Sequence, residues 1–268
     1  MKAVGSSRWV NHQSFPPAPT REHCPNAGQL PACHWAGTAR LAGLGVEQMV
    51  RVKICGIRSR EDAEIAMAAG ADAIGLLVGQ VHDSPDFISP SKARAICAAT
   101  GPFVVSVLVT HLAEPQAIVE LAQQIPAWVI QLHNDLPVEA LQALRCSLAP
   151  RKLLGKVSVE GPAALLRARE ISGCIDALLL DSCDRTSNRM GGTGLVHDWN
   201  LSAQIVRESP VPVILAGGLT SANVAKAIDL VHPWGVDVNT GVKADAGGKS
   251  AERCRQFVSA SKAESGGG

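Results

Sequence analysis

The sequence predicts a single (β/α)8 barrel of the TIM type, and two observations support this α/β fold. Eight short apolar runs alternate with eight helix-like segments over about 210 residues, which is the repeat and the size of a compact barrel. The runs are apolar throughout, as strands buried on both faces should be. A doubly wound open sheet is the alternative. It is disfavoured because the connections are short and no G-x-G-x-x-G pattern follows the first run.

The predicted strands and helices alternate strictly along the chain. The first helix has the clearest start, because Ser59 can cap it and Glu61 and Asp62 suit its positive end. We expect strands over residues 52–55, 73–78, 103–109, 128–132, 152–157, 177–180, 211–215 and 235–238. We expect helices over residues 61–69, 91–98, 115–123, 138–144, 161–170, 201–207, 221–230 and 250–259.

The composition is that of a globular protein with one sizeable core. Of its 268 residues, 46% are hydrophobic and 18% are charged, and the formal net charge is +1. A charge near zero gives no electrostatic reason to expect nucleic acid as a partner. No apolar run approaches the ~20 residues that a membrane helix needs. We therefore expect neither nucleic acid nor a membrane as a partner.

The two ends of the chain do not share the pattern of the barrel. Residues 1–48 carry five prolines between positions 16 and 31 and no sustained periodicity, which predicts a disordered extension. Met49 directly precedes the first strand, so a misassigned start with a true start at Met49 would explain the extension. We expect the barrel to occupy residues 49–262 and residues 263–268 to form a flexible tail.

The eight cysteines are scattered and include no C-x-x-C pair. This usage favours free thiols in a reducing, cytoplasmic setting. His23-Cys24 and Cys33-His34 faintly resemble a zinc site, but their surroundings are rich in proline and have no pattern. We expect no metal site.

Two reactive side chains stand at strand ends, where a barrel of this kind places its active site. Cys55 ends the first strand before a helix start, and a thiol that faces the positive end of a helix can be partly ionised and act as a base. Asp181 closes the apolar sixth strand, where a low dielectric favours the protonated acid. The two residues are candidates for an acid–base pair across the barrel mouth. The alternatives are a buried structural cysteine and a carboxylate that caps loop amides.

Glycine-bearing loops follow the sixth, seventh and eighth strands. Glycine lets a backbone approach an oxyanion closely, and a helix that begins near Ser221 would direct its free amides at the same place. Ordinary tight turns are the alternative reading. We expect a phosphate site here, with substrate contacts from other strand-end residues nearby. The candidates are Gly192, Gly194, Gly217, Gly218 and Gly241, together with His133, Asn239 and Thr240.

The sequence from about residue 52 to residue 257 resembles the phosphoribosylanthranilate isomerase family. The segments that carry the resemblance, in order, are Lys53-Ile54-Cys55-Gly56-Ile57, Ala69-Gly70-Ala71-Asp72, Gln131-Leu132-His133, Leu179-Leu180-Asp181-Ser182, Gly191-Gly192-Thr193-Gly194, His197-Asp198-Trp199, Leu215-Ala216-Gly217-Gly218-Leu219 with Asn223-Val224, Gly235-Val236-Asp237-Val238 and Gly248-Lys249.

The resemblance implies an activity and the residues that perform it. It implies an Amadori rearrangement of a phosphoribosyl amine in tryptophan biosynthesis, with Cys55 as general base and Asp181 as general acid. The glycine-rich loops would hold the phosphate of a small phosphorylated sugar. No metal or organic cofactor would be needed, and we expect a monomer or a homodimer.

Three positions depart from the family's pattern. Asp86 stands where the family has an arginine that pairs with the anthranilate carboxylate, and Lys243 stands where the family has a glutamate. Asn134 replaces a glycine after the fourth strand, which is a mild change because asparagine tolerates the same backbone conformation. Two alternatives therefore stay open: an isomerase that acts on another phosphosugar, and a regulatory protein that binds a phosphosugar without turnover.

Overall fold

The computed structural model describes residues 49–184, 189–190 and 198–263. The chain divides into two units, Met1–Leu30 and Pro31–Gly268. The first unit lies wholly outside the described residues, and so do the remainder of the 1–48 extension and residues 264–268. The predictions of a disordered extension and of a flexible tail from residue 263 therefore stay predictions.

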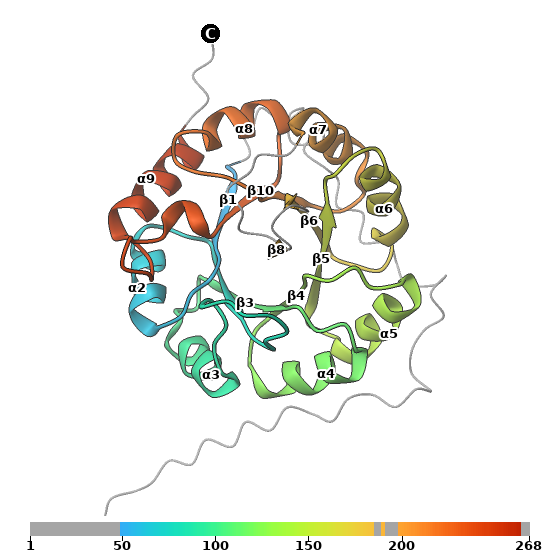
Figure 1. The fold of residues 1–268 in the computed structure, drawn as a ribbon, viewed down its shortest axis with the longest axis horizontal. Coiled ribbons are helices and arrows are strands. Elements are labelled where there is room, and N and C mark those ends of the chain that lie inside the picture. The colour runs from blue at the N-terminus through green and yellow to red at the C-terminus, as the bar shows by residue number, and fades with distance from the viewer. Residues whose placement is uncertain (1–48, 185–188, 191–197, 264–268) are drawn as a thin grey trace, which may run out of the picture. The chain divides into compact units, whose positions relative to one another are not determined.

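Eight parallel strands close into a barrel in the order β1-β10-β9-β6-β5-β4-β3-β2 (Figure 1), which confirms the predicted fold class. The strands are β1 (Arg51–Ile54), β2 (Ala73–Leu77), β3 (Val105–Thr110), β4 (Val129–Leu132), β5 (Lys152–Ser158), β6 (Ala177–Asp181), β9 (Val213–Leu215) and β10 (Gly235–Val238). A short antiparallel pair, β7 (Cys183–Asp184) with β8 (Arg189–Met190), follows β6. The sequence pattern did not predict this hairpin.

Eight α-helices of the described residues form a ring around the barrel (Figure 1). They are α2 (Arg60–Ala68), α3 (Pro90–Ala99), α4 (Pro115–Gln124), α5 (Val138–Leu148), α6 (Ala163–Ile171), α7 (Trp199–Glu208), α8 (Val224–Val231) and α9 (Ala251–Lys262). Side-chain caps fix several starts: Ser59 Oγ accepts from the Asp62 amide at α2, and Ser250 Oγ accepts from the Arg253 amide at α9.

The start of α8 differs from the expectation of a helix from Ser221. The helix begins at Val224 because the side chain of Asn223 ties the preceding turn together. Its Oδ1 accepts from the Thr220 amide over 2.8 Å, and its Nδ2 donates to the Gly218 carbonyl over 3.0 Å. Asparagine often forms such local bonds, which compete with helix formation.

Most other boundaries fall within two residues of those expected; the exceptions are the ends of α5, at Leu148 rather than residue 144, and of α9, at Lys262 rather than residue 259. Phe103, expected in the third strand, precedes β3 and is 94% exposed. Trp128 precedes β4 and is 53% exposed. Large apolar residues at the outer ends of strands are common on protein surfaces, so apolarity alone did not mark the strand starts. Helix α5 continues to Leu148, which packs in the core.

The side chains of each strand alternate between two environments. Val52 and Ile54 belong to the large hydrophobic core that includes residues of the helices, whereas Lys53 and Cys55 face the other way, into the barrel. The interior of the barrel therefore holds polar and reactive groups above small apolar clusters. None of the helices in the described part of the chain is long and apolar enough to cross a membrane.

We predict that the core between barrel and helices dominates stability. Phe257 on α9 is fully buried, whereas Phe103 is 94% exposed. Phe257→Ala should lower the free energy of unfolding by about 3–5 kcal/mol because it leaves a cavity. The matched control Phe103→Ala should change it by less than about 0.5 kcal/mol. Urea unfolding followed by circular dichroism measures both, and equal losses would contradict this account of the core.

Candidate active site

A buried ion pair stands beside Cys55 at the end of β1. Lys53 Nζ donates to Asp237 Oδ2 on the adjacent strand β10 over 2.8 Å, and the two side chains are only 5% and 7% exposed. Lys53 and Cys55 are two residues apart on one strand face, and the charge of the Lys53 ammonium acts to lower the pKa of the thiol. Each buried charge depends on its partner for stabilisation. Cys55 therefore sits next to a fixed positive charge.

Gly75 on β2 provides the space that these two side chains occupy. A Cβ atom at position 75 would lie 2.7 Å from Cys55 Sγ and 3.1 Å from Lys53 Nζ. The thiol and the ammonium therefore lie together over this glycine. Any side chain at position 75 would displace the thiol from its place.

The environment of Cys55 keeps its thiol protonated in the free protein. Burial raises the pKa of the thiol, Asp237 adds to the rise, and the ammonium groups of Lys53 and Lys249 offset only part of it. The expectation of a partly ionised thiol at the positive end of a helix is therefore wrong for the free protein. Helix α2 begins at Arg60 rather than directly after Cys55.

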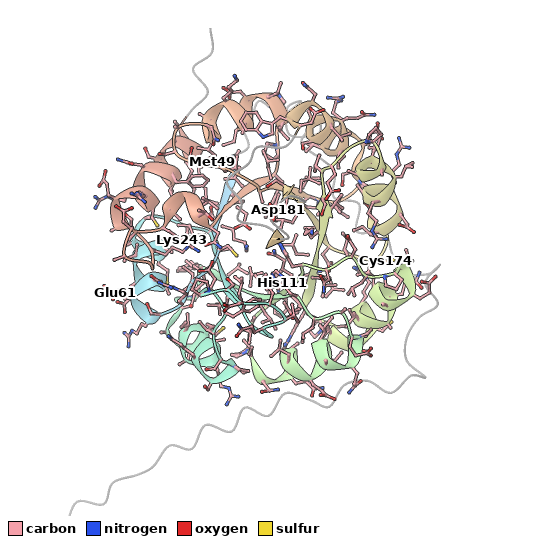
Figure 2. The ribbon with its side chains drawn as sticks, viewed as in Figure 1. Met49, Glu61, His111, Cys174, Asp181 and Lys243 are labelled. Carbon is pink, nitrogen blue, oxygen red and sulfur yellow. The ribbon has the colours of Figure 1, made fainter. Side chains whose placement is uncertain are left out.

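Asp181 ends β6 and is 6% exposed (Figure 2). Burial raises its pKa to about 6, and the negative charge of Asp237 contributes to the rise, against the opposing effects of Lys156 and of the Ser182 amide. That amide donates to Asp181 Oδ1 over 2.8 Å. Burial and the nearby Asp237 carboxylate thus keep Asp181 protonated up to about pH 6, a pH at which an ordinary aspartate is already ionised.

His133, which follows β4, lies close to Asp181 as a neutral imidazole. Burial lowers its pKa well below the ordinary value, and nearby His111 and Lys156 add to the effect. The Gln131 side-chain amide donates to Nδ1 over 3.2 Å, so the ring proton lies on Nε2. That nitrogen is 3.7 Å from Asp181 Oδ2, longer than a hydrogen bond. Because the ring is neutral, the contact is not an ion pair.

The loop after β9 packs tightly against Ser182 at the end of β6, and the loop after β10 packs against the loop after β9. Gly217 has a φ angle of 79°, and a Cβ there would lie 2.6 Å from the Ser182 amide nitrogen. A Cβ at Gly241 would lie 2.3 Å from the carbonyl oxygen of Leu219. Gly217 and Gly241 are therefore required by the packing of the loops after β9 and β10, in addition to any role toward phosphate.

The remaining members of the predicted phosphate site are only partly described. Gly218 follows Gly217 and also has a positive φ angle, 66°, where a β-branched side chain would be strained. Thr240 is exposed and begins the short 3-10 helix η2 (Thr240–Val242). Gly192 and Gly194 lie outside the described residues.

Asp86 and Lys243 form an ion pair between the loops that follow β2 and β10. Asp86 Oδ2 accepts from Lys243 Nζ over 2.6 Å and from Asn239 Nδ2 over 2.9 Å. Burial acts to raise the pKa of Asp86, but these hydrogen bonds outweigh it and lower the pKa below its usual value. Asp86 is thus an ionised carboxylate neutralised by Lys243. The two departures from the family's pattern compensate each other.

Asn239 joins this ion pair to the cysteine end of the site. Its Oδ1 accepts from Lys249 Nζ over 2.9 Å. A Cβ at Gly56 would lie 2.4 Å from the same oxygen, so the amide sits directly over the backbone that follows Cys55. Both ends of the Asn239 amide are engaged by protein groups, which supports a positioning role for a residue expected to touch the substrate.

Three charged residues of the barrel interior were missed as site residues: Lys53, Lys156 and Asp237. Each is at most 7% exposed, and each affects the pKa of Asp181. The sequence did carry a signal, because each interrupts an otherwise apolar strand. A charge inside a buried strand needs a partner or a function.

Among the described residues, no three His, Cys, Asp or Glu side chains converge as metal ligands. The groups that do converge are a thiol, a carboxyl with a raised pKa and fixed ammonium ions. Such a set is suited to moving protons on a carbon–oxygen framework. The expectation that no metal or organic cofactor is required stays a prediction.

We predict that Asp181 destabilises the fold at neutral pH. The pKa of Asp181 is about 6 in the folded state, above its value in the unfolded chain, so ionising this carboxyl costs more free energy in the folded state. This cost is absent below pH ~4, where both states are protonated, and complete above pH ~6. Two units of pKa correspond to at most about 3 kcal/mol. Asp181→Asn should therefore increase the free energy of unfolding at pH 7.5 by about 1–3 kcal/mol and give little gain at pH 4. Urea titrations at both pH values test this; a destabilised variant at pH 7.5 would contradict the raised pKa.

The comparisons with known proteins agree with the predicted resemblance. The family model of N-(5'phosphoribosyl)anthranilate (PRA) isomerase matches residues 52–260. N-(5'-phosphoribosyl)anthranilate isomerase 2 of Methanosarcina mazei is 40% identical over 213 residues, which cover 80% of this chain and 94% of that protein.

The crystal structure of phosphoribosyl anthranilate isomerase from Thermotoga maritima aligns with a TM-score of 0.70 and 33% identity, over 80% of this chain and 99% of that chain. A crystal structure of the isomerase in complex with reduced 1-(o-carboxyphenylamino)-1-deoxyribulose 5-phosphate aligns with a TM-score of 0.67 and 32% identity, over 80% and 99% of the two chains. The chain belongs to the N-(5'-phosphoribosyl)anthranilate isomerase family.

Proposed function

We propose that this chain isomerises N-(5-phosphoribosyl)anthranilate to 1-(2-carboxyphenylamino)-1-deoxyribulose 5-phosphate, a step of tryptophan biosynthesis. The observation that carries the proposal is the placement of Cys55 and Asp181. Both are buried at the carboxyl ends of barrel strands, and both have raised pKa values. A site that only binds a phosphosugar needs neither group, which argues against a regulatory protein without turnover.

The reaction divides into two proton transfers that these residues can perform. Asp181 donates its proton to the ribose ring oxygen, and the ring opens to a Schiff base between C1 and the anthranilate nitrogen. Cys55 then removes the proton from C2, which gives an enolamine. The enolamine takes up a proton at C1 while the C2 hydroxyl loses its proton, so that C2 becomes the carbonyl of the ketose. The atoms balance because the substrate and the product are isomers.

The charges around the pair allow the two groups to exchange roles. At neutral pH the free protein holds an ionised Asp181 and a protonated Cys55, because the thiol keeps its proton to higher pH. The reactive form has the same number of protons but places one on Asp181 and leaves a thiolate at Cys55. The ammonium of Lys53, beside the thiol, favours this form. We assign Lys53 as a positioning residue for the base.

The neighbouring loops after β6, β9 and β10 support a phosphate site. Backbone amides at glycine-rich turns bind oxyanions well, and Asn223 braces the turn that includes Gly218. The ligand named for the related complex carries a 5-phosphate and a carboxyphenyl group. We propose that the substrate phosphate lies at Gly217, Gly218 and Gly241. We also propose that Gly192 and Gly194, outside the described residues, complete the site, as the resemblance implies.

The alternative of a different phosphosugar substrate rested on Asp86, whose charge would repel the anthranilate carboxylate. Lys243 neutralises that charge at a distance of 2.6 Å. The ground for preferring another substrate is therefore weakened, and no other observation favours one. A monomeric or homodimeric state stays a prediction.

We predict that each member of the pair is needed for turnover but not for folding. Cys55→Ala and Asp181→Asn should each lower kcat about 10²- to 10⁴-fold, the usual share of general acid–base catalysis. Substrate binding should change far less, because neither residue is assigned to hold the substrate.

The assay follows conversion of phosphoribosylanthranilate by wild type and variants. Cys97→Ala and Asp245→Asn serve as matched controls, because Cys97 lies on α3 and the Asp245 side chain is 90% exposed. Near-full turnover in Cys55→Ala would show that the base lies elsewhere. A wild-type protein without turnover would contradict the proposed function itself.

A further inference from the structure

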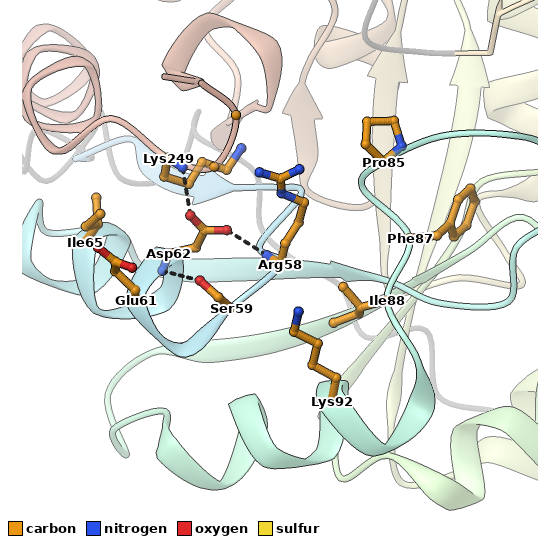
Figure 3. A pocket seen from close by; sticks show the side chains of 12 residues that line it. Arg58, Ser59, Glu61, Asp62, Ile65, Pro85, Phe87, Ile88, Lys92 and Lys249 are labelled. Atoms are coloured by element: carbon orange, nitrogen blue, oxygen red, sulfur yellow. Dashed lines mark hydrogen bonds between the residues drawn. The ribbon is translucent and has the colours of Figure 1, made fainter. Parts of the chain in front are cut away.

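A pocket of about 410 Å³ lies between three segments of the barrel mouth (Figure 3). These segments are the start of α2, the connection from β2 to α3, and the connection from η2 to α9. Pro85, Phe87 and Ile88 give the pocket an apolar side, and Ile65 lies at the opposite end beside Glu61 (Figure 3). Neither the proposed acid–base pair nor the phosphate loops use this pocket.

Three cations, Arg58, Lys92 and Lys249, line the pocket together with two acids, Glu61 and Asp62. The buried acid among them, Asp62, bonds only to backbone. Its Oδ2 accepts from the Arg58 amide over 2.9 Å, and its Oδ1 accepts from the Lys249 amide over 2.7 Å (Figure 3). Asp62 therefore fixes the two segments that carry Arg58 and Lys249. In the described ranges, no carboxylate forms an ion pair with the Arg58 guanidinium or the Lys92 ammonium.

The loop before Lys249 is shaped around the Arg58 guanidinium. Gly247 has a φ angle of 85°, and a Cβ there would lie 2.9 Å from Arg58 Nη2. Gly248 has a φ angle of 77°, and its Cβ would lie 3.5 Å from the same atom. The guanidinium thus rests against glycine backbone and is half-buried. This packing limits the freedom of its donors before a ligand arrives, which lowers the entropy cost of binding.

The pocket is linked to the reacting centre through Lys249. The Lys249 ammonium bonds Asn239, over the backbone that follows Cys55, and its charge acts on the Cys55 thiol. The phosphate loops lie on the β10-β9-β6 side of β1, whereas this pocket lies toward β2. A ligand with its phosphate in those loops and C2 over Cys55 therefore extends toward the pocket.

We propose that this pocket binds the carboxylate of an aromatic acid, and that Arg58 recognises the anthranilate end of the substrate. The inference rests on the proposed function and adds a specificity-determining residue to it. A guanidinium can hold a carboxylate by two parallel hydrogen bonds, and the apolar side of the pocket can receive the ring. Lys92 adds a second, exposed charge. Lys243 is unsuited to this role because Asp86 already neutralises it.

The test measures the affinity of two ligands by calorimetry, independently of turnover. One is reduced 1-(o-carboxyphenylamino)-1-deoxyribulose 5-phosphate, and the other is the same compound without the carboxyl group. Arg58→Ala should weaken binding of the first roughly 10- to 100-fold, as expected for loss of hydrogen bonds to a charged group. It should change binding of the second by less than about twofold. Arg58→Lys should recover part of the loss, because lysine restores the positive charge but cannot form the two parallel hydrogen bonds of a guanidinium.

Two further variants keep the outcome interpretable. Arg60→Ala removes a nearby exposed arginine paired with Glu64 and should leave both affinities unchanged. Lys92→Ala lies on the surface, so it should fold, and it should weaken only the carboxylated ligand, by a smaller factor than Arg58→Ala.

The results separate this inference from the proposed function. Equal losses for both ligands in Arg58→Ala, or no loss, would overturn the inference while wild-type turnover of phosphoribosylanthranilate still upheld the function. Carboxylate-dependent binding through Arg58 without turnover would uphold the inference and overturn the function. A wild type that binds neither ligand would overturn both.

Discussion

The site depends on one buried ion pair, that between Lys53 on β1 and Asp237 on β10. Removing either partner would leave an uncompensated charge in the barrel, which is far more costly than losing an exposed pair. The pair also sets the electrostatics of both reactive groups. Lys53 favours a thiolate at Cys55, and Asp237 favours a proton on Asp181. A single interaction therefore favours the reactive state at both positions.

The barrel makes this arrangement possible because its strands present alternate residues to two different environments. Val52 and Ile54 of β1 pack against the helices, whereas Lys53 and Cys55, which directly follows β1, face the barrel interior. Gly75 leaves the space in which Cys55 and Lys53 meet. Around this centre, the loops that carry the tightly packed Gly217 and Gly241 lie on one side, and a pocket lined by Arg58, Lys92 and Lys249 lies on the other. We propose that the two sides receive the two anionic ends of a phosphoribosylated aromatic acid.

Much of this was readable from sequence, and the limits have physical causes. Continuous apolar runs such as residues 177–180 are sufficient to predict buried parallel strands, and the position of Cys55 and Asp181 at strand ends follows from them. The state of the Cys55 thiol was not predictable, because burial and neighbouring charges come from strands distant in sequence. The same holds for the pair between Asp86 and Lys243, separated by 157 positions. The sequence shows two unusual charges there, and only the fold shows that they neutralise each other.

The central claim is that Asp181 and Cys55 act as an acid–base pair whose pKa values lie far apart. It is tested most directly by the pH dependence of kcat/KM, which reports the free enzyme. The account predicts a plateau that falls off below about pH 6, where Asp181 titrates, and again only in alkali, where Cys55 ionises. In Asp181→Asn the fall-off near pH 6 should disappear. The residual rate should instead rise steadily with pH until the Cys55 thiol ionises. An unchanged acidic limb in that variant would contradict the account.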